Sequence, residues 1–86
     1  MKPGIPIVIG ERFRLLSYGR GLAYAIERIE GEEWRSVFFV QGDDAAQFRE
    51  ELEAVESRHP DQPNDVALRL LAGDYYDLDL DTAPAA

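Results

Sequence analysis

The fold is decided by residues 33–55, whose sequence is EWRSVFFVQGDDAAQFREELEAV. The first nine of these residues are rich in β-branched and aromatic side chains, which favours a strand over residues 33–41. The VFFV stretch at 37–40 is apolar at every position, so both faces of this strand need cover. One helix can cover one face. The other face must meet another part of the chain, a ligand or a second subunit.

A helix is predicted directly after this strand. Asp43 or Asp44 caps its first turn, and Asp44 with Gln47 fits a capping box. His59 and Pro60 end the helix, because the residue before a proline avoids the helical conformation. The apolar stripe that this helix buries is predicted at Ala45, Phe48, Leu52 and Val55.

Three more strands are predicted upstream. The first covers residues 5–9, where Pro6 indicates a sheet edge or a strand start. The second covers residues 11–18. A hairpin follows at Gly19-Arg20-Gly21, because glycine tolerates positive φ angles. We predict the third strand over residues 22–30, although an amphipathic helix competes there because alanine and glutamate weaken β propensity.

A second, short helix is predicted after the loop at 59–64. Asn64 or Asp65 caps it, and Gly73 stops it. These elements together predict an α+β fold: a four-stranded antiparallel sheet followed by a helix (β-β-β-β-α), then a short second helix and an acidic C-terminal strand or tail. We expect a single domain at 1–73 and a separate acidic segment at 74–86.

The acidic segment supports several hypotheses. Residues 74–81, DYYDLDLD, could be a solvated acidic terminus, or a strand added to a sheet edge through Leu78 and Leu80. They could also imitate nucleic acid and compete for an arginine-bearing face. Calcium binding is a further option, but the run lacks the glycine and the distal glutamate of an EF-hand loop. Residues 82–86 are expected to be disordered.

Composition limits the class of protein. A chain of 86 residues makes one domain, and the absence of cysteine excludes a disulfide or a thiolate zinc site. Because so small a chain buries only about 60–65% of its unfolded surface, we expect it to dimerise. The sequence shows neither a signal-peptide pattern nor an apolar run near the ~20 residues of a membrane span. We therefore expect a soluble cytoplasmic protein without a membrane association.

The net charge of −8 is unevenly distributed along the chain. Residues 1–42 hold six basic residues and five glutamates, whereas residues 43–86 hold three arginines and twelve carboxylates. Strong net acidity repels nucleic acid at long range. The nearly neutral first half could still face a polyanion, and the acidic second half could not.

Three stretches resemble a known family: ERFRLLSY at 11–18, GRGLAYAIERI at 19–29 and VFFVQGDDAAQFREELEAV at 37–55. Their order and spacing, over about residues 5–58, resemble a repeat of the Pur family, the single-stranded nucleic-acid-binding proteins related to the Whirly and transcription-coactivator folds. The resemblance implies a β-β-β-β-α unit. It also implies that two units intertwine, as homodimers in single-repeat bacterial members, which would cover the second face of 37–40.

The resemblance further implies that single-stranded DNA or RNA binds to basic and aromatic residues of the sheet. The matching positions here are Arg12, Arg14, Tyr18, Arg20 and Tyr24. This chain departs from the family because its sheet has almost no lysine and because residues 59–86 have no counterpart. The alternative is a solvated face whose arginines pair across strands with Glu11, Glu27 or Glu33.

Apolar residues of the last strand and of the tail are assigned to a dimer interface or to the core. They are Val37, Phe39, Leu78 and Leu80. Aromatic residues of the last strand could also stack on bases, although a strand beside a helix more often buries them in the core. The aromatics concerned are Trp34, Phe38 and Phe39.

No catalytic pattern is found. The single histidine, His59, precedes a proline in a loop, and the chain has no P-loop, GxGxxG, HExxH or metal-ligand spacing. We predict a non-enzymatic binding module without cofactor or metal, a Pur-like homodimer that binds single-stranded nucleic acid. The alternative is an acidic protein–protein interaction module that keeps the fold and docks on a basic protein, as a regulator or as a mimic of nucleic acid.

Overall fold

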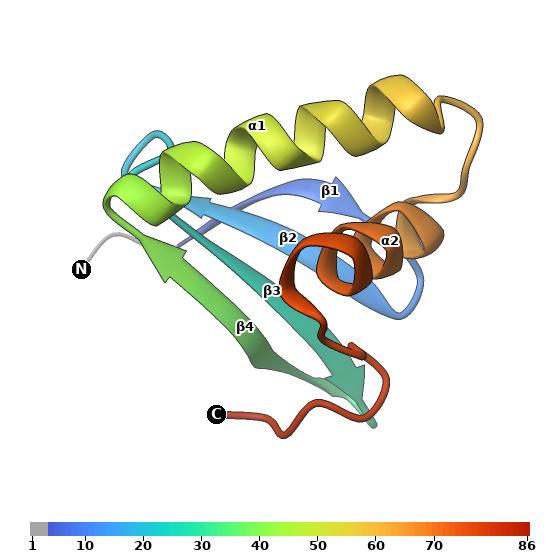
Figure 1. Cartoon of the computed structure of the whole chain (residues 1–86). Helices are drawn as coiled ribbons and strands as arrows, with labels where there is room; N and C mark the ends of the chain where they lie inside the picture. Colours follow the sequence, from blue (N-terminus) through green and yellow to red (C-terminus); the bar gives the residue numbers. More distant parts are fainter. Residues whose placement is uncertain (1–3) are drawn as a thin grey trace.

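The computed structural model describes residues 4–86 and has an α+β fold, in which four antiparallel strands precede two helices (Figure 1). This confirms the predicted fold class, and the competing helix for residues 22–30 is excluded because this stretch forms a strand. No helix within residues 4–86 is long and apolar enough to cross a membrane. The elements are β1 (Ile5–Ile9), β2 (Phe13–Tyr18), β3 (Ala23–Glu30), β4 (Glu33–Gln41), α1 (Asp43–Arg58) and α2 (Asn64–Tyr76).

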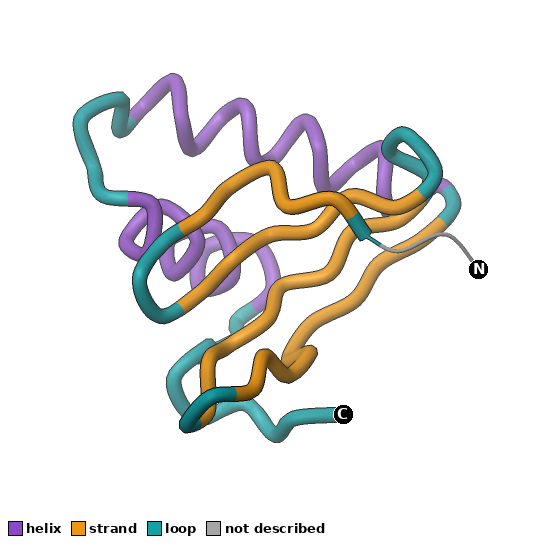
Figure 2. The backbone as a smooth tube through the Cα atoms, turned by 180° about the vertical axis from the view of Figure 1, so that it is seen from behind, coloured by secondary structure: helices purple, strands orange, loops and turns teal. Residues whose placement is uncertain are grey.

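The strands form one meander in the order β1-β2-β3-β4, and both helices lie on the same face of it. The view from behind shows the strands in front of the helices, so the second face carries no helix (Figure 2). Each strand pair is antiparallel, and β3 and β4 change register where Val37 bulges out of the ladder. The sheet is therefore covered by helices on one side only.

The β2–β3 hairpin forms where the glycines predict it. Gly19, Arg20 and Gly21 all have positive φ, at 57°, 59° and 92°. Glycine adopts this conformation without a Cβ penalty, which leaves Arg20 as the residue that bears the local strain. Leu22 closes the turn by donating its N–H to the carbonyl of Tyr18 at 3.0 Å.

Helix α1 buries the predicted stripe, but its start differs from the prediction. The N-cap residue is Gly42, and no side chain caps the helix within the described residues. Asp43 and Asp44 lie inside the first turn, where their charges favour the positive end of the helix dipole. The predicted capping box of Asp44 and Gln47 is therefore wrong, whereas Ala45, Phe48, Leu52 and Val55 are buried as predicted.

Helix α2 is longer than predicted. Gly73 does not stop it, and the left-handed residue that ends it is Asp77, with φ 50°. The N-cap is Pro63, so neither Asn64 nor Asp65 caps the helix as predicted. Both side chains instead hold the β1–β2 turn. Asn64 Nδ2 donates to the carbonyl of Ile9 at 2.8 Å, and Asp65 accepts two backbone N–H groups.

The C-terminal segment, residues 77–86, runs from the end of α2 past the end of the sheet where β3 and β4 are joined, and it forms no strand (Figure 1). Leu80 and Ala83 are buried, and Leu80 belongs to the main hydrophobic core. The N–H of Ala86 donates to the carbonyl of Ser36 on β4 at 2.8 Å. Among the alternatives for this segment the added edge strand is wrong, and in the stretch expected to be disordered, 82–86, Ala83 is buried and Ala86 bonds to β4.

Candidate functional site

The face of the sheet that carries no helix is the candidate site. Strand alternation and register decide which residues reach it, because successive side chains point to opposite faces. Phe13, Leu15, Tyr24 and Ile26 are buried on the helix side. The opposite side, which we call the open face, consists of Pro6, Ile9, Arg14, Leu16, Tyr18, Ala23, Ala25, Glu27, Ile29, Trp34, Ser36, Phe39 and Gln41.

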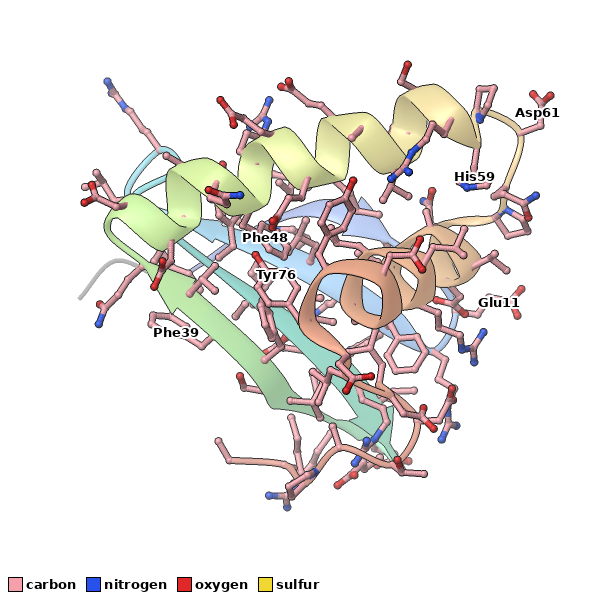
Figure 3. The ribbon with its side chains drawn as sticks, in the orientation of Figure 1. Glu11, Phe39, Phe48, His59, Asp61 and Tyr76 are labelled. Atoms are coloured by element: carbon pink, nitrogen blue, oxygen red, sulfur yellow. The ribbon has the colours of Figure 1, made fainter. Side chains whose placement is uncertain are left out.

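One end of the open face is aromatic. Tyr18 and Phe39 meet edge to face, with ring centroids 6.3 Å apart. Phe39 is 52% exposed, whereas Leu16 and Ala25, which lie in the same row of the sheet, are buried. In the side-chain view Phe39 lies beside β4, while Phe48 and Tyr76 lie in the core between the helices and the sheet (Figure 3). Exposure of so large an aromatic ring indicates a surface built for contact.

The other end of the open face carries one ion pair. Arg14 Nε lies 2.6 Å from Glu27 Oε1, and the Arg14 guanidinium stands 4.5 Å from the centroid of the Trp34 ring. Both charged side chains are mostly buried, so solvent screens this pair less than an exposed one. Within the described residues the open face is therefore apolar, aromatic and electrically neutral.

The five residues predicted to bind nucleic acid do not share one face. Arg14 and Tyr18 lie on the open face, but Tyr24 is only 2% exposed and lies under α1, where Arg49 Nη1 donates to its hydroxyl at 3.3 Å. Arg12 precedes β2 and pairs with the C-terminal segment, and Arg20 is exposed at the hairpin tip. The structure places two of the five, Arg14 and Tyr18, on one face, at its opposite ends.

Most arginines of residues 4–86 are paired with carboxylates. The pair Arg14–Glu27 joins β2 to β3 and agrees with the cross-strand alternative, whereas Arg35 and Glu33 pair within β4. Asp81 lies between two arginines. The hydrogen bond from Arg69, followed by that from Arg12, lowers the pKa of Asp81. The full set is Arg12–Asp81, Arg14–Glu27, Arg28–Glu30, Arg35–Glu30, Arg35–Glu33, Arg49–Glu53 and Arg69–Asp81.

The four residues assigned to a dimer interface or the core separate into two groups. Leu80 is buried in the core, and Val37 and Leu78 are partly buried against it. Phe39 alone among these four is exposed and able to contact a partner. Trp34, considered as a base-stacking residue or a core residue, lies half-buried on the open face beneath Arg14.

Sequence reasoning missed the role of Arg28. Its side chain is 8% exposed, and its Nη1 donates to the carbonyls of Leu80 and Ala83 at 2.7 and 2.8 Å. Its hydrogen bond to Glu30 also lowers the pKa of that carboxyl group. Strand alternation could have revealed this role, because Arg28 lies four residues after Tyr24 and therefore on the same, helix-covered side of β3. A buried arginine on that side needs hydrogen-bond acceptors.

Two further titratable residues within 4–86, His59 and Tyr76, make contacts that hold the helices. His59 lies in the loop between α1 and α2 (Figure 3). Its backbone N–H donates to the carbonyl of Val55 at the end of α1. In the part of the chain that the structure describes, no cluster of three histidine or acidic residues could hold a metal ion. Burial and the hydrogen bond to Glu51 raise the pKa of Tyr76, a core contact between α2 and α1.

Comparison with protein-family models, with curated proteins and with solved structures gave no match for this chain. The description of this chain therefore rests on its structure alone, a four-stranded antiparallel sheet that is followed by two helices and has one face without a helix.

Proposed function

We propose that this chain is a non-enzymatic, acidic protein–protein interaction module that forms a homodimer through the open face. The observation that carries the proposal is the contrast between that face and the rest of the molecule. The open face is apolar and neutral, with Phe39 exposed, in a chain of net charge −8. A second copy can approach this face without bringing like charges together.

The size of the molecule sets an upper limit on such an interface. Its two longest extents, 31 and 26 Å, limit one flat side to roughly 800 Å², so an interface of standard size, about 800 Å² per partner, would use nearly all of that side. Aromatic side chains at the centre of an interface supply most of its affinity. Tyr18, Trp34 and Phe39 would be these anchors, and the Arg14–Glu27 pair would be enclosed between the two sheets.

Dimerisation through the open face would leave the helix layers of both copies outermost. The exposed side of α1 carries Asp43, Asp44, Glu50 and Glu56, so each copy would present a negative surface. A partner for that surface is a basic protein, because complementary charge accelerates and orients association. The module would then act as an acidic dimer that occupies the basic site of another protein, in the place of a nucleic acid.

A second candidate is the Pur-like function, binding of single-stranded DNA or RNA through the open face. The observation in its favour is the aromatic content of that face, since each base that stacks on an aromatic ring contributes about 1–3 kcal/mol. The element order also fits a β-β-β-β-α repeat. Against it, Arg14 is the one arginine on the open face, and Glu27 neutralises it.

Sedimentation equilibrium of the parent and of Phe39→Asp tests the proposal. The parent should be a dimer at micromolar concentration and the variant a monomer, because the new carboxylate would be buried without a partner. Tyr75→Asp is the matched control, because Tyr75 is also an exposed aromatic but lies on α2, away from the open face. A monomeric parent, or dissociation by both variants alike, contradicts the proposal.

Fluorescence anisotropy with a labelled single-stranded oligonucleotide separates the two candidates. The interaction module should show no binding at low salt, where phosphate contacts are strongest. Binding that weakens steeply with salt and is lost on Trp34→Ala would favour the second candidate instead.

A further inference from the structure

A second surface, at the edge of the sheet, has features that the open face does not explain. β1 is an edge strand, and its outer side has no strand partner within residues 4–86. Two of its side chains, Ile5 and Ile7, are 66% and 42% exposed, whereas the exposed Ile9 pairs with Arg14 and belongs to the open face. Edge strands usually carry charges that prevent unwanted pairing, so an apolar edge indicates a surface that is normally in contact.

A groove runs between this edge and α1. Its apolar floor is formed by Ile7, Val8 and Leu52, and its volume is about 270 Å³. That is below the roughly 300–1,000 Å³ of pockets that hold small organic ligands, and it suits individual side chains of a peptide better. Figure 1 shows α1 passing along the β1 side of the sheet.

The rim of the groove is acidic. It is formed by Arg49, Glu53 and Glu56. Arg49 is committed to Glu53 at 3.3 Å and to the hydroxyl of Tyr24 at 3.3 Å. Glu56 has no hydrogen bond or ion pair among residues 4–86. The rim therefore has an excess negative charge that a cationic side chain can neutralise.

A second copy of this chain does not fit the groove. Two β1 edges laid together would oppose the Glu53 and Glu56 carboxylates of both copies. Pro6 has no N–H, and the register of β1 shifts between Pro6 and Val8, which interrupts a long ladder with any identical strand. Charge and backbone both exclude self-pairing here.

We propose that this groove binds a short extended segment of a partner protein in which apolar and basic residues alternate. Its apolar residues enter the groove against Ile7 and Leu52, and the long flexible stems of the lysines or arginines between them let their charges turn back to Glu53 and Glu56 at the rim. Pairing with the β1 backbone is short, because Pro6 limits it at one end and Asn64 occupies the carbonyl of Ile9 at the other. Side chains therefore supply most of the affinity.

The test uses the full chain, labelled with ¹⁵N, and an acetylated, amidated hexapeptide of alternating lysine and isoleucine. Amide shifts should move saturably in β1 and along the part of α1 that lines the groove, from Arg49 to Glu56. A hexapeptide of alternating glutamate and isoleucine should cause no such shifts. Glu56→Lys should weaken binding about fivefold, the effect of roughly 1 kcal/mol.

Glu50→Lys is the matched control, because Glu50 is exposed on α1 but does not line the groove, and it should change the affinity less than twofold. Ile7→Thr keeps an exposed β-branched residue on the strand and should weaken binding without unfolding the protein. No shifts at millimolar peptide, equal binding of the acidic peptide, or equal effects of Glu50→Lys and Glu56→Lys would overturn the proposal. Peptide binding by Phe39→Asp separates this site from the open face, because the two surfaces share no residue.

Discussion

Replacement of Arg28 by methionine tests whether the C-terminal segment is part of the fold. Arg28 is the buried charged residue that joins β3 to this segment, through hydrogen bonds to the carbonyls of Leu80 and Ala83 at 2.7 and 2.8 Å. Methionine keeps much of the length and the apolar stem of the side chain. It removes the donors, so the two carbonyls must remain unpaired or return to water.

The expected loss of stability is about 2–4 kcal/mol. Leaving a buried polar group without its partner costs about 1–3 kcal/mol, and two carbonyls are affected. The cost is limited by release of the segment, which re-exposes Leu80 at about 1.5–3 kcal/mol and hydrates the carbonyls. A chain of 86 residues has roughly 4–13 kcal/mol of total stability, so the loss is a large share of it.

Urea unfolding followed by circular dichroism measures this loss. Arg35→Met is the matched control, because Arg35 lies half-exposed on β4 and its ion pairs with Glu30 and Glu33 are accessible to water. That change should cost about 1 kcal/mol or less. If Arg28→Met is no more destabilising than Arg35→Met, the segment is not held by Arg28 and the reasoning fails.

Three further substitutions, Asp65→Ala, Gly10→Ala and Asp81→Asn, test contacts that join α2 and the C-terminal segment to the β1–β2 turn. Asp65→Ala removes the acceptor of the N–H groups of Arg12 and Phe13, at 2.9 and 3.0 Å, and should cost about 1–3 kcal/mol in urea unfolding. Gly10→Ala places a Cβ 1.9 Å from Asp65 Oδ1, so it should be less destabilising in the Asp65→Ala background, where only the 3.0 Å contact with the carbonyl oxygen of Phe13 remains; equal costs in both backgrounds would refute this clash. The pKa of Asp81 is lowered from 3.8 in the folded state, so its contribution to stability is present above that value and is lost as the pH falls through the folded pKa. Thermal unfolding should therefore show a smaller loss on acidification below about pH 4 for Asp81→Asn than for the parent, and an unchanged acid response would contradict the ion pair.

The sequence predicts those parts of the fold in which local pattern and tertiary contact agree. Alternation placed the four strands, and the helical spacing of Ala45 to Val55 placed the buried stripe of α1. The prediction failed where a side chain had two possible partners. Asn64 and Asp65 are good caps in isolation, but in the folded chain the β1–β2 turn lies within their reach and takes both. The residues next to Asn64 and Asp65 in the sequence cannot reveal this, because the competing partners lie more than fifty residues away.

The candidate site shows the same limit. Strand alternation puts Arg14 and Tyr18 on one face of β2, but the partner residues on β3 depend on the register set by the hairpin. In the observed register Ser17 opposes Tyr24, so Tyr24 lies on the opposite face from Tyr18 and is covered by α1. A shift of one residue would have brought the two tyrosines together.

The nearly neutral residues 1–42 and the acidic residues 43–86 do not form two separate regions in the folded chain, because ion pairs join them. Asp81, from the acidic half, pairs with Arg12 from the first half and with Arg69 from its own half, while Arg14 is neutralised by Glu27 within the sheet. Once these pairs form, the negative charges without partners lie mainly outside the sheet, with α1 carrying several of them. A neutral face and an acidic face then lie on opposite sides of one small domain. Two copies of the neutral face do not repel each other, so this face is suited to a homodimer. The acidic face repels another copy of itself and is suited to a basic partner.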